Sequence, residues 1–217
     1  EAIKPSARLK FGFSYFKISR DGRVVVTAGL AERSPDRYLI QLWDVRTAKA
    51  TSEWLVRADR IRALALSPDG RFIALAPDSP QAEPRPYEVW LFEAATGKPL
   101  GEPLRPRFEV AVLAFSPDCK SLLTGGGRPR YGKVWLWDVA TGRGHPPLEA
   151  PAEGPPGIFG IAISPDGRTL AAACNELNQA ILWDLETRRI RRRIPHHDVA
   201  SVAFSPREPI LATGTLG

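Results

Sequence analysis

The 217-residue sequence has little of the chemistry on which metal and redox sites depend. It contains no methionine, two cysteines and three histidines, and these five residues are Cys119, Cys174, His145, His196 and His197. None of them stands at the short spacing typical of metal ligands, and no cysteine–histidine pattern indicates a catalytic nucleophile. We therefore expect no metal site, no cofactor and no catalytic cysteine.

Long hydrophobic segments are also missing. No apolar run approaches the roughly 20 residues of a membrane-spanning helix, and no basic-then-apolar signal segment follows Glu1. We therefore expect no membrane contact. Two cysteines that are not placed to pair fit a reducing compartment and predict a cytoplasmic location. Because the sequence lacks an initial methionine and stops at Gly217 midway through a repeating unit, we expect it to be an excerpt of a longer chain.

What the sequence does contain is a repeated hairpin. In "LALSPDGRFIAL", from Leu64 to Leu75, two apolar stretches flank a turn in which proline presets one dihedral angle and glycine supplies a positive φ. Nearly unbroken apolar stretches such as this predict strands buried on both faces. Related hairpins recur at intervals of roughly 48 residues, a period typical of stacked repeating units. Their aligned serines are Ser19, Ser67, Ser116, Ser164 and Ser205.

A second recurring element follows each complete hairpin. It is an apolar strand that closes on Trp-Asp or, once, on Phe-Glu, in the stretches "LIQLWDV", "EVWLFEA", "KVWLWDV" and "AILWDL". A further turn comes next, such as "ATGK" or "ATGR", and then a polar stretch that predicts an exposed fourth strand. One complete unit is therefore expected to contain four strands.

Together the two elements resemble the WD-repeat family of β-propellers, whose blades are four-stranded antiparallel sheets. The arginine-rich, lysine-poor composition and the regular "SPDGR" turns are similar to bacterial members. The resemblance implies an all-β fold in which a single propeller segment spans 1–217. Because a closed ring needs whole blades, we expect an arc of a larger ring of about seven blades, with a closed four-bladed ring as the alternative. About four and a half blades are expected, at about 15–57, 61–105, 110–151, 158–194 and, in part, 199–217.

The sequence departs from the family pattern in one respect. Typical repeats place Gly-His before the first strand and an aspartate before the third, and these form a buried hydrogen-bond network with a serine or threonine and the tryptophan. Only "HHDVASVAFS", from His196 to Ser205, resembles the first part, and no aligned aspartate precedes Trp43, Trp137 or Trp183. We therefore expect most blades to lack this network.

The resemblance implies a non-catalytic scaffold that binds other proteins, and many bacterial WD-repeat arrays are joined to kinase or other signalling domains. The alternative is a propeller enzyme with a site in the central channel, but innermost strands such as "IRALAL" and "VAVLAF" offer almost no polar side chains. Asp69, Asp118 and Asp166 recur once per unit, so we interpret them as turn formers. The glycine-rich "TGGGRPRYG", Thr124 to Gly132, lacks the ending of a phosphate loop and is interpreted as a loop between a second and a third strand.

The net charge of +6 and the sequence pI of about 9.6 favour a partner with an acidic surface. The densest basic run is "RRIRRRI", from Arg188 to Ile194. It lies in a predicted outer strand, where arginines oppose edge-to-edge pairing. Nucleic-acid binding is the alternative, but no aromatic residues interleave with the run as a stacking platform requires.

A second basic set would be assembled from several blades. In the geometry implied by the family, loops between second and third strands share one face with the loops that join blades. Acidic residues are interspersed among the basic ones, so an ordinary solvated surface of mixed charge is the alternative, and the proline-rich loop Pro77 to Pro86 belongs to the same face. Arginine and tyrosine are favoured at protein-binding hot spots. The predicted partner-binding residues are Arg57, Arg60, Arg85, Arg107, Arg128, Arg130 and Tyr131.

Overall fold

The computed structural model describes residues 14–32, 34–58, 60–78, 87–126, 133–148, 151 and 157–215. In these ranges the regular elements are β-strands, with one short 3₁₀ turn, η1 (Asn175–Leu177). The chain divides into two compact units, residues 1–103 and 104–217, and each is described separately. No helix in the described ranges is long and apolar enough to cross a membrane.

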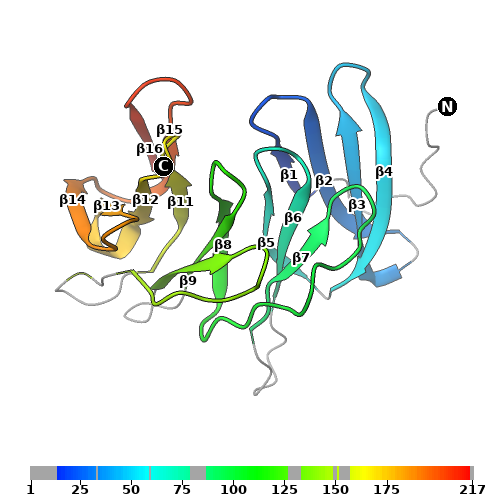
Figure 1. The fold of residues 1–217 in the computed structure, drawn as a ribbon, viewed down its shortest axis with the longest axis horizontal. Coiled ribbons are helices and arrows are strands. Elements are labelled where there is room, and N and C mark those ends of the chain that lie inside the picture. Colours follow the sequence, from blue (N-terminus) through cyan, green and yellow to red (C-terminus); the bar gives the residue numbers. More distant parts are fainter. Residues whose placement is uncertain are drawn as a thin grey trace. The chain divides into compact units, whose positions relative to one another are not determined.

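The first unit contains two antiparallel sheets in which neighbours in sequence are neighbours in space (Figure 1). The first sheet has four strands in the order β1, β2, β3, β4, and the second has three in the order β5, β6, β7. Their bounds are β1 (Tyr15–Ile18), β2 (Val24–Ala31), β3 (Ser34–Asp44), β4 (Lys49–Arg57), β5 (Ile61–Leu66), β6 (Phe72–Pro77) and β7 (Trp90–Glu93).

The second unit contains three antiparallel sheets of the same up-and-down kind. They have three, four and two strands. The strands are β8 (Val110–Phe115), β9 (Ser121–Gly126) and β10 (Lys133–Asp138), then β11 (Gly160–Ile163), β12 (Thr169–Cys174), β13 (Gln179–Asp184) and β14 (Ile190–Pro195), and finally β15 (Val199–Phe204) and β16 (Leu211–Thr215). The all-β architecture of up-and-down antiparallel sheets, two of which have four strands in the described ranges, agrees with the prediction from the repeated hairpins.

Among the residues that the structure describes, the fourth segment is a regular strand only in the sheets that end in β4 and β14. After β7, pairing is reduced to one bridge between Phe92 and Pro99, and after β10 to one between Trp137 and Gly144. These segments contain several prolines, in "KPLGEP" and "GHPPLEAP". Proline has no N–H to donate to a ladder, so it restricts pairing to isolated positions.

The predicted hairpin turns form by the same hydrogen bonds in four units. In the first, the Ser19 hydroxyl donates to Asp21 Oδ1 at 2.6 Å and accepts the Val24 N–H at 2.9 Å, while the Arg23 N–H donates to Asp21 Oδ1 at 3.0 Å. The same set recurs around Ser67, Ser116 and Ser164. The predicted positive φ is confirmed at Gly22, Gly70 and Gly167, and Cys119 adopts it in the third turn with a φ of 60°.

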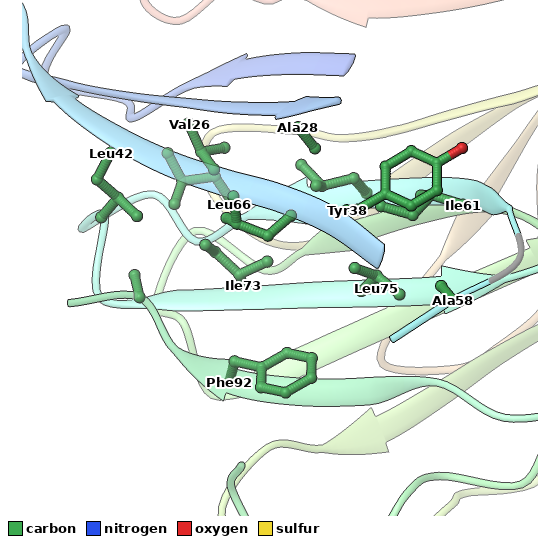
Figure 2. Close-up of a cluster of buried hydrophobic side chains, with 13 residues drawn as sticks. Val26, Ala28, Tyr38, Leu42, Ala58, Ile61, Leu66, Ile73, Leu75 and Phe92 are labelled. Atoms are coloured by element: carbon green, nitrogen blue, oxygen red, sulfur yellow. The ribbon is translucent and has the colours of Figure 1, made fainter. Parts of the chain in front are cut away.

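Apolar side chains from both sheets of the first unit meet in one core. Figure 2 shows Val26 and Leu42 of the first sheet facing Leu66 and Ile73 of the second. Trp54 of β4 also packs on this core, with its ring centroid 5.0 Å from that of Phe92. Each fully buried valine, leucine or isoleucine contributes about 1.5–3 kcal/mol, so packing between sheets stabilises the unit. The predicted exposed fourth strand is therefore partly covered in β4.

The second unit has an equivalent core between its three-stranded and four-stranded sheets. It includes Leu123 and Val134 on one side and Leu170, Ile181 and Trp183 on the other. The second strands are the most deeply placed, since every residue of β12 is buried. The first strands are not, because β11 is half-buried throughout and β8 is half-buried over its four central residues. The prediction of burial on both faces holds for most of β5, in which five of six residues are buried, but not for β8 or β11.

Candidate partner-binding surface

Two of the predicted contact residues lie at one edge of the first unit. Arg57 ends β4 and its Nε lies 3.4 Å from Asp36 Oδ2, whereas Arg60 precedes β5 and its Nε lies 3.9 Å from Asp78 Oδ2. Asp36 belongs to the start of β3, and Asp78 follows β6. The start of a third strand, the end of a second strand and the link between sheets therefore meet at this edge, which we call the linker edge.

Backbone hydrogen bonds fix the linker edge. The Ala58 N–H donates to the Asp36 carbonyl at 3.0 Å, and the Asp78 N–H donates to the Arg60 carbonyl at 2.6 Å. The aromatic ring of Tyr15 also lies at this edge, where its hydroxyl donates a hydrogen bond to the Ile61 carbonyl at 2.7 Å. Partial burial raises the pKa of the Tyr15 hydroxyl. Sequence reasoning missed Tyr15, which directly precedes the first repeated apolar stretch.

The charge of the linker edge is partly compensated. Asp78 lies within ion-pair distance of both Arg60 and Arg62, the latter at 3.2 Å. The side chains of Arg57 and Arg60 are 83% and 75% exposed, so each ion pair contributes at most about 1 kcal/mol. These pairs do little for stability, but they reduce the positive field that an acidic partner would meet.

In the second unit, the predicted residue within the described ranges is Arg107, which is exposed and lies just before β8. The end of β9 approaches the same place. Gly126 has a φ of +154°, and a Cβ at this position would collide with the Glu109 carbonyl oxygen. The end of the second strand therefore lies beside the link that carries Arg107. Arg85, Arg128, Arg130 and Tyr131 lie outside the described residues.

The carboxylates considered for catalysis are turn formers, as predicted for Asp69, Asp118 and Asp166. In the last two, the hydrogen bond from the neighbouring serine hydroxyl holds the pKa of the carboxyl below its usual value. A side chain that is held as an ionised acceptor by its own turn is poorly suited to carry a proton in catalysis. We therefore interpret these aspartates as residues that stabilise their own hairpin turns.

The aspartate of each Trp-Asp pair has a similar role that sequence reasoning missed. Asp44 Oδ1 accepts hydrogen bonds from the N–H and the hydroxyl of Thr47 at 2.7 and 2.8 Å, and these bonds lower the pKa of Asp44. Asp138 and Asp184 are bonded in the same way to threonines three residues later. The signal was the recurring spacing Asp-x-x-Thr in "WDVRT", "WDVAT" and "WDLET".

Part of the family's buried hydrogen-bond network is present. The indole N–H of Trp43 donates to Thr27 Oγ1 at 2.9 Å, and that of Trp137 donates to Thr124 Oγ1 at 3.0 Å. Thr124 to Gly126 belong to β9, so the loop that was predicted from Thr124 to Gly132 begins after Gly126. The threonine faces the tryptophan of the next strand because both lie on the same face of an antiparallel pair.

The histidines and cysteines do not converge. Cys119 and Cys174 are not joined in a disulfide, and burial raises the pKa of Cys174 to about 12. His145 Nδ1 lies 3.3 Å from an Arg188 guanidinium nitrogen, and His196 Nδ1 is buried. Within the described parts of the chain, no group of three or more His, Cys, Asp or Glu side chains could hold a metal ion.

Comparison with known proteins points to the same repeats. The family model described as "WD domain, G-beta repeat" matches residues 188–217, which contain the "HHDVASVAFS" stretch singled out above. "Protein LST8 homolog" from Drosophila melanogaster is 38% identical over 94 residues, which cover 38% of this chain and 28% of that protein. The chain therefore spans less than a third of the length of this relative. Both similarities support the WD-repeat family, in agreement with the observed sheets.

Proposed function

We propose that the chain is a non-catalytic protein-interaction scaffold. The observation that carries this proposal is that the polar side chains recurring in each unit are used inside their own turns, as in the serine–aspartate and Asp-x-x-Thr hydrogen bonds. These hydrogen bonds stabilise the sheets and do not involve the longer connecting loops, which can therefore contact a partner. Binding residues are concentrated on loops that a rigid scaffold holds in place. WD repeats generally mediate binding between proteins, which agrees with this role.

The proposal extends to the setting of the chain. We infer an arc of a larger ring of about seven blades in a bacterial-type, cytoplasmic protein linked to signalling, with the blades at about 15–57, 61–105, 110–151, 158–194 and 199–217. The regular SPDGR turns and the arginine-rich composition support the bacterial type. The partner is another protein with an acidic surface, and nucleic acid or membrane is not the expected target.

We place the contact on two parts of the chain, the linker edge of the first unit and the Arg107 link of the second. Because Arg57 and Arg60 are partly neutralised by Asp36 and Asp78, the main contribution is expected from the other predicted residues. Arg107 is exposed and forms no ion pair with a described residue. The contact set is completed by Arg85, Arg128, Arg130 and Tyr131.

The test is quantitative capture of partners from the native host by the full-length protein. Charge reversal of Arg107, Arg128 and Arg130 should remove the captured proteins, while reversal of the exposed Arg46, Arg143 and Arg168 should retain them, with equal thermal unfolding in both variants. Partners that survive the first set unchanged would place the contact elsewhere. Stoichiometric metal or a hydrolytic activity in the purified protein would favour the enzyme alternative instead.

A further inference from the structure

The first strand of the second sheet has a β-bulge at the linker edge. The register between β5 and β6 shifts between Ile61 and Ala63, so Arg62 is the extra residue of its strand. A bulge redirects the side chain of the extra residue, and bulges are frequent beside functional sites. The bulges at the same place in β8 and β15 have alanine as the extra residue, Ala111 and Ala200. Of these three strands, β5 is therefore the one that brings a charged side chain to the bulge.

The backbone around this bulge is held by two other strands of the first unit. The Tyr15 hydroxyl of β1 donates to the Ile61 carbonyl at 2.7 Å and lies 3.4 Å from the Arg62 carbonyl oxygen. On the other side, the Asp78 N–H, which follows β6, donates to the Arg60 carbonyl at 2.6 Å. The side chain of Ile61, between the two arginines, is buried in the core of the unit. These contacts fix the points from which both arginine side chains extend.

The carboxylate of Asp78 lies between the two guanidinium groups. Its Oδ1 is 3.2 Å from Arg62 Nη1 and its Oδ2 is 3.9 Å from Arg60 Nε. The Asp78 side chain is 25% exposed, whereas the Arg62 and Arg60 side chains are 40% and 75% exposed. We call these three residues the arginine bracket. Two positive groups and one negative group leave a single positive charge, which one monovalent anion would neutralise.

The neighbouring ion pair of the linker edge is balanced. Arg57 Nε lies 3.4 Å from Asp36 Oδ2, and one positive and one negative group leave no surplus charge. In the ranges that the structure describes, the ion pair of Asp36 involves one arginine, whereas Asp78 is shared by two. Asp36 can therefore reduce the local charge, but it does not hold two guanidinium groups together.

We propose that the arginine bracket binds an aspartate or glutamate side chain of the partner protein and that Asp78 is a positioning residue for it. The inference rests on the proposed scaffold function and adds Arg62 and Asp78 to the contact. Arginine forks match the planar carboxylate geometrically. Nucleic acid is disfavoured, because its charge recurs at every phosphate while the bracket offers one surplus charge beside the carboxylates of Asp78 and Asp36.

Asp78 has two opposite effects on an approaching carboxylate. Its own negative charge weakens the positive field. It also orders two long side chains before binding, and each side chain that must be immobilised on binding weakens affinity by roughly two- to tenfold. Because exposed charges are screened by salt and ordering is not, we expect the second effect to dominate at physiological ionic strength. Removing this negative charge should therefore weaken the binding of an acidic peptide.

The test uses surface plasmon resonance with the full-length protein and an immobilised peptide in which glutamate alternates with serine. The counterpart with glutamine in place of glutamate serves as the reference and should bind less. Asp78→Asn should weaken binding to the glutamate peptide by at least about threefold, since two side chains lose their fixed position. The matched control, Asp36→Asn, changes the net charge equally at the same edge and should bind equally well or more tightly. Arg62→Lys should also weaken binding, whereas the exposed Arg46→Lys should not.

Circular dichroism melts show whether each variant is folded. Tighter binding of Asp78→Asn, to the same degree as Asp36→Asn, would overturn the proposal, because Asp78 would then act through its charge alone. Equal binding of the glutamate and glutamine peptides would overturn it as well, and so would tighter binding of a peptide with phosphoserine in place of glutamate. Charge reversal of Arg107, Arg128 and Arg130 lies outside the bracket and should leave the effect of Asp78→Asn unchanged. Loss of partner capture in that variant and loss of the Asp78 effect are thus separate outcomes.

Discussion

The serine of each hairpin turn should contribute more to stability than a turn residue usually does, and Ser164 is the best place to measure this. Its side chain is buried, with 7% exposure, and it forms two hydrogen bonds. The hydroxyl donates to Asp166 Oδ1 and accepts the buried Thr169 N–H at 2.9 Å. Ser164→Ala removes both bonds and leaves a buried N–H without a partner, with almost no change in side-chain volume.

The magnitude follows from these two bonds. Leaving a buried donor unsatisfied costs about 1–3 kcal/mol, so we expect a loss of about 2 kcal/mol and a lower Tm by about 4–8 °C. Ser205→Ala is the matched control. In that turn the serine hydroxyl accepts only exposed N–H groups of Arg207 and Glu208, at 3.4 and 3.2 Å, and water can replace it. We expect a change within about 0.5 kcal/mol there.

The pH dependence supplies a second readout. The Ser164 hydrogen bond lowers the pKa of Asp166 from its ordinary value of 3.8. A group whose pKa is lower in the folded state stabilises the fold above the unfolded-state pKa, and this contribution is lost as the pH falls through the folded-state value. The difference in Tm between the unmodified chain and Ser164→Ala should therefore shrink below about pH 4. Calorimetry that shows equal losses for Ser164→Ala and Ser205→Ala at neutral pH would refute the reasoning.

Three further outcomes are expected. Gly97→Ala should cost more stability than Gly22→Ala in chemical denaturation, because both glycines have positive φ but only at Gly97 would a Cβ meet an indole, at 2.5 Å; equal costs would contradict this. Iodoacetamide should modify Cys119 in the folded chain and the buried Cys174 only after unfolding, as mass spectrometry can show. The isolated chain should self-associate in size-exclusion chromatography, and Phe16→Asp should reduce this because Phe16 is 71% exposed; a sharp monomer peak before the substitution would argue against it.

The features that sequence predicted well are those that short stretches determine. The turn from Ser67 to Gly70 contains its own hydrogen-bond partners and its own positive-φ residue, so no distant contact is needed to specify it. The same holds for the Asp-x-x-Thr turns, which could have been found from their spacing. The electrostatic environment of the partner-binding residues could not be predicted from short stretches. The positive charge of Arg57, for example, is partly compensated by Asp36, which lies on a different strand.

Other features depend on packing between elements, which periodicity alone does not reveal. The apolar runs of β5 and β8 look alike and both strands lie at the edge of a sheet, yet β5 is mostly buried and the four central residues of β8 are half-buried. Trp54 lies in a stretch that reads as polar, but the neighbouring sheet provides Phe92 and the Ala94 carbonyl to receive it. The pairing of β14 is a further example, since a bulge opposite Leu182 and Trp183 makes Arg191 the extra residue of its strand.

The serine–aspartate turns also have a consequence for the order of folding. The bonds that close each hairpin join residues two to five positions apart, such as Ser67 with Asp69 and with Phe72. Contacts this local close a loop in well under a microsecond, and hairpins form in about 1–10 μs. The bond from Tyr15 to Ile61 joins residues 46 positions apart and requires two sheets to meet. Hairpins should therefore form first and independently along the chain, and the docking of finished hairpins, with the apolar packing that follows, should set the overall folding rate.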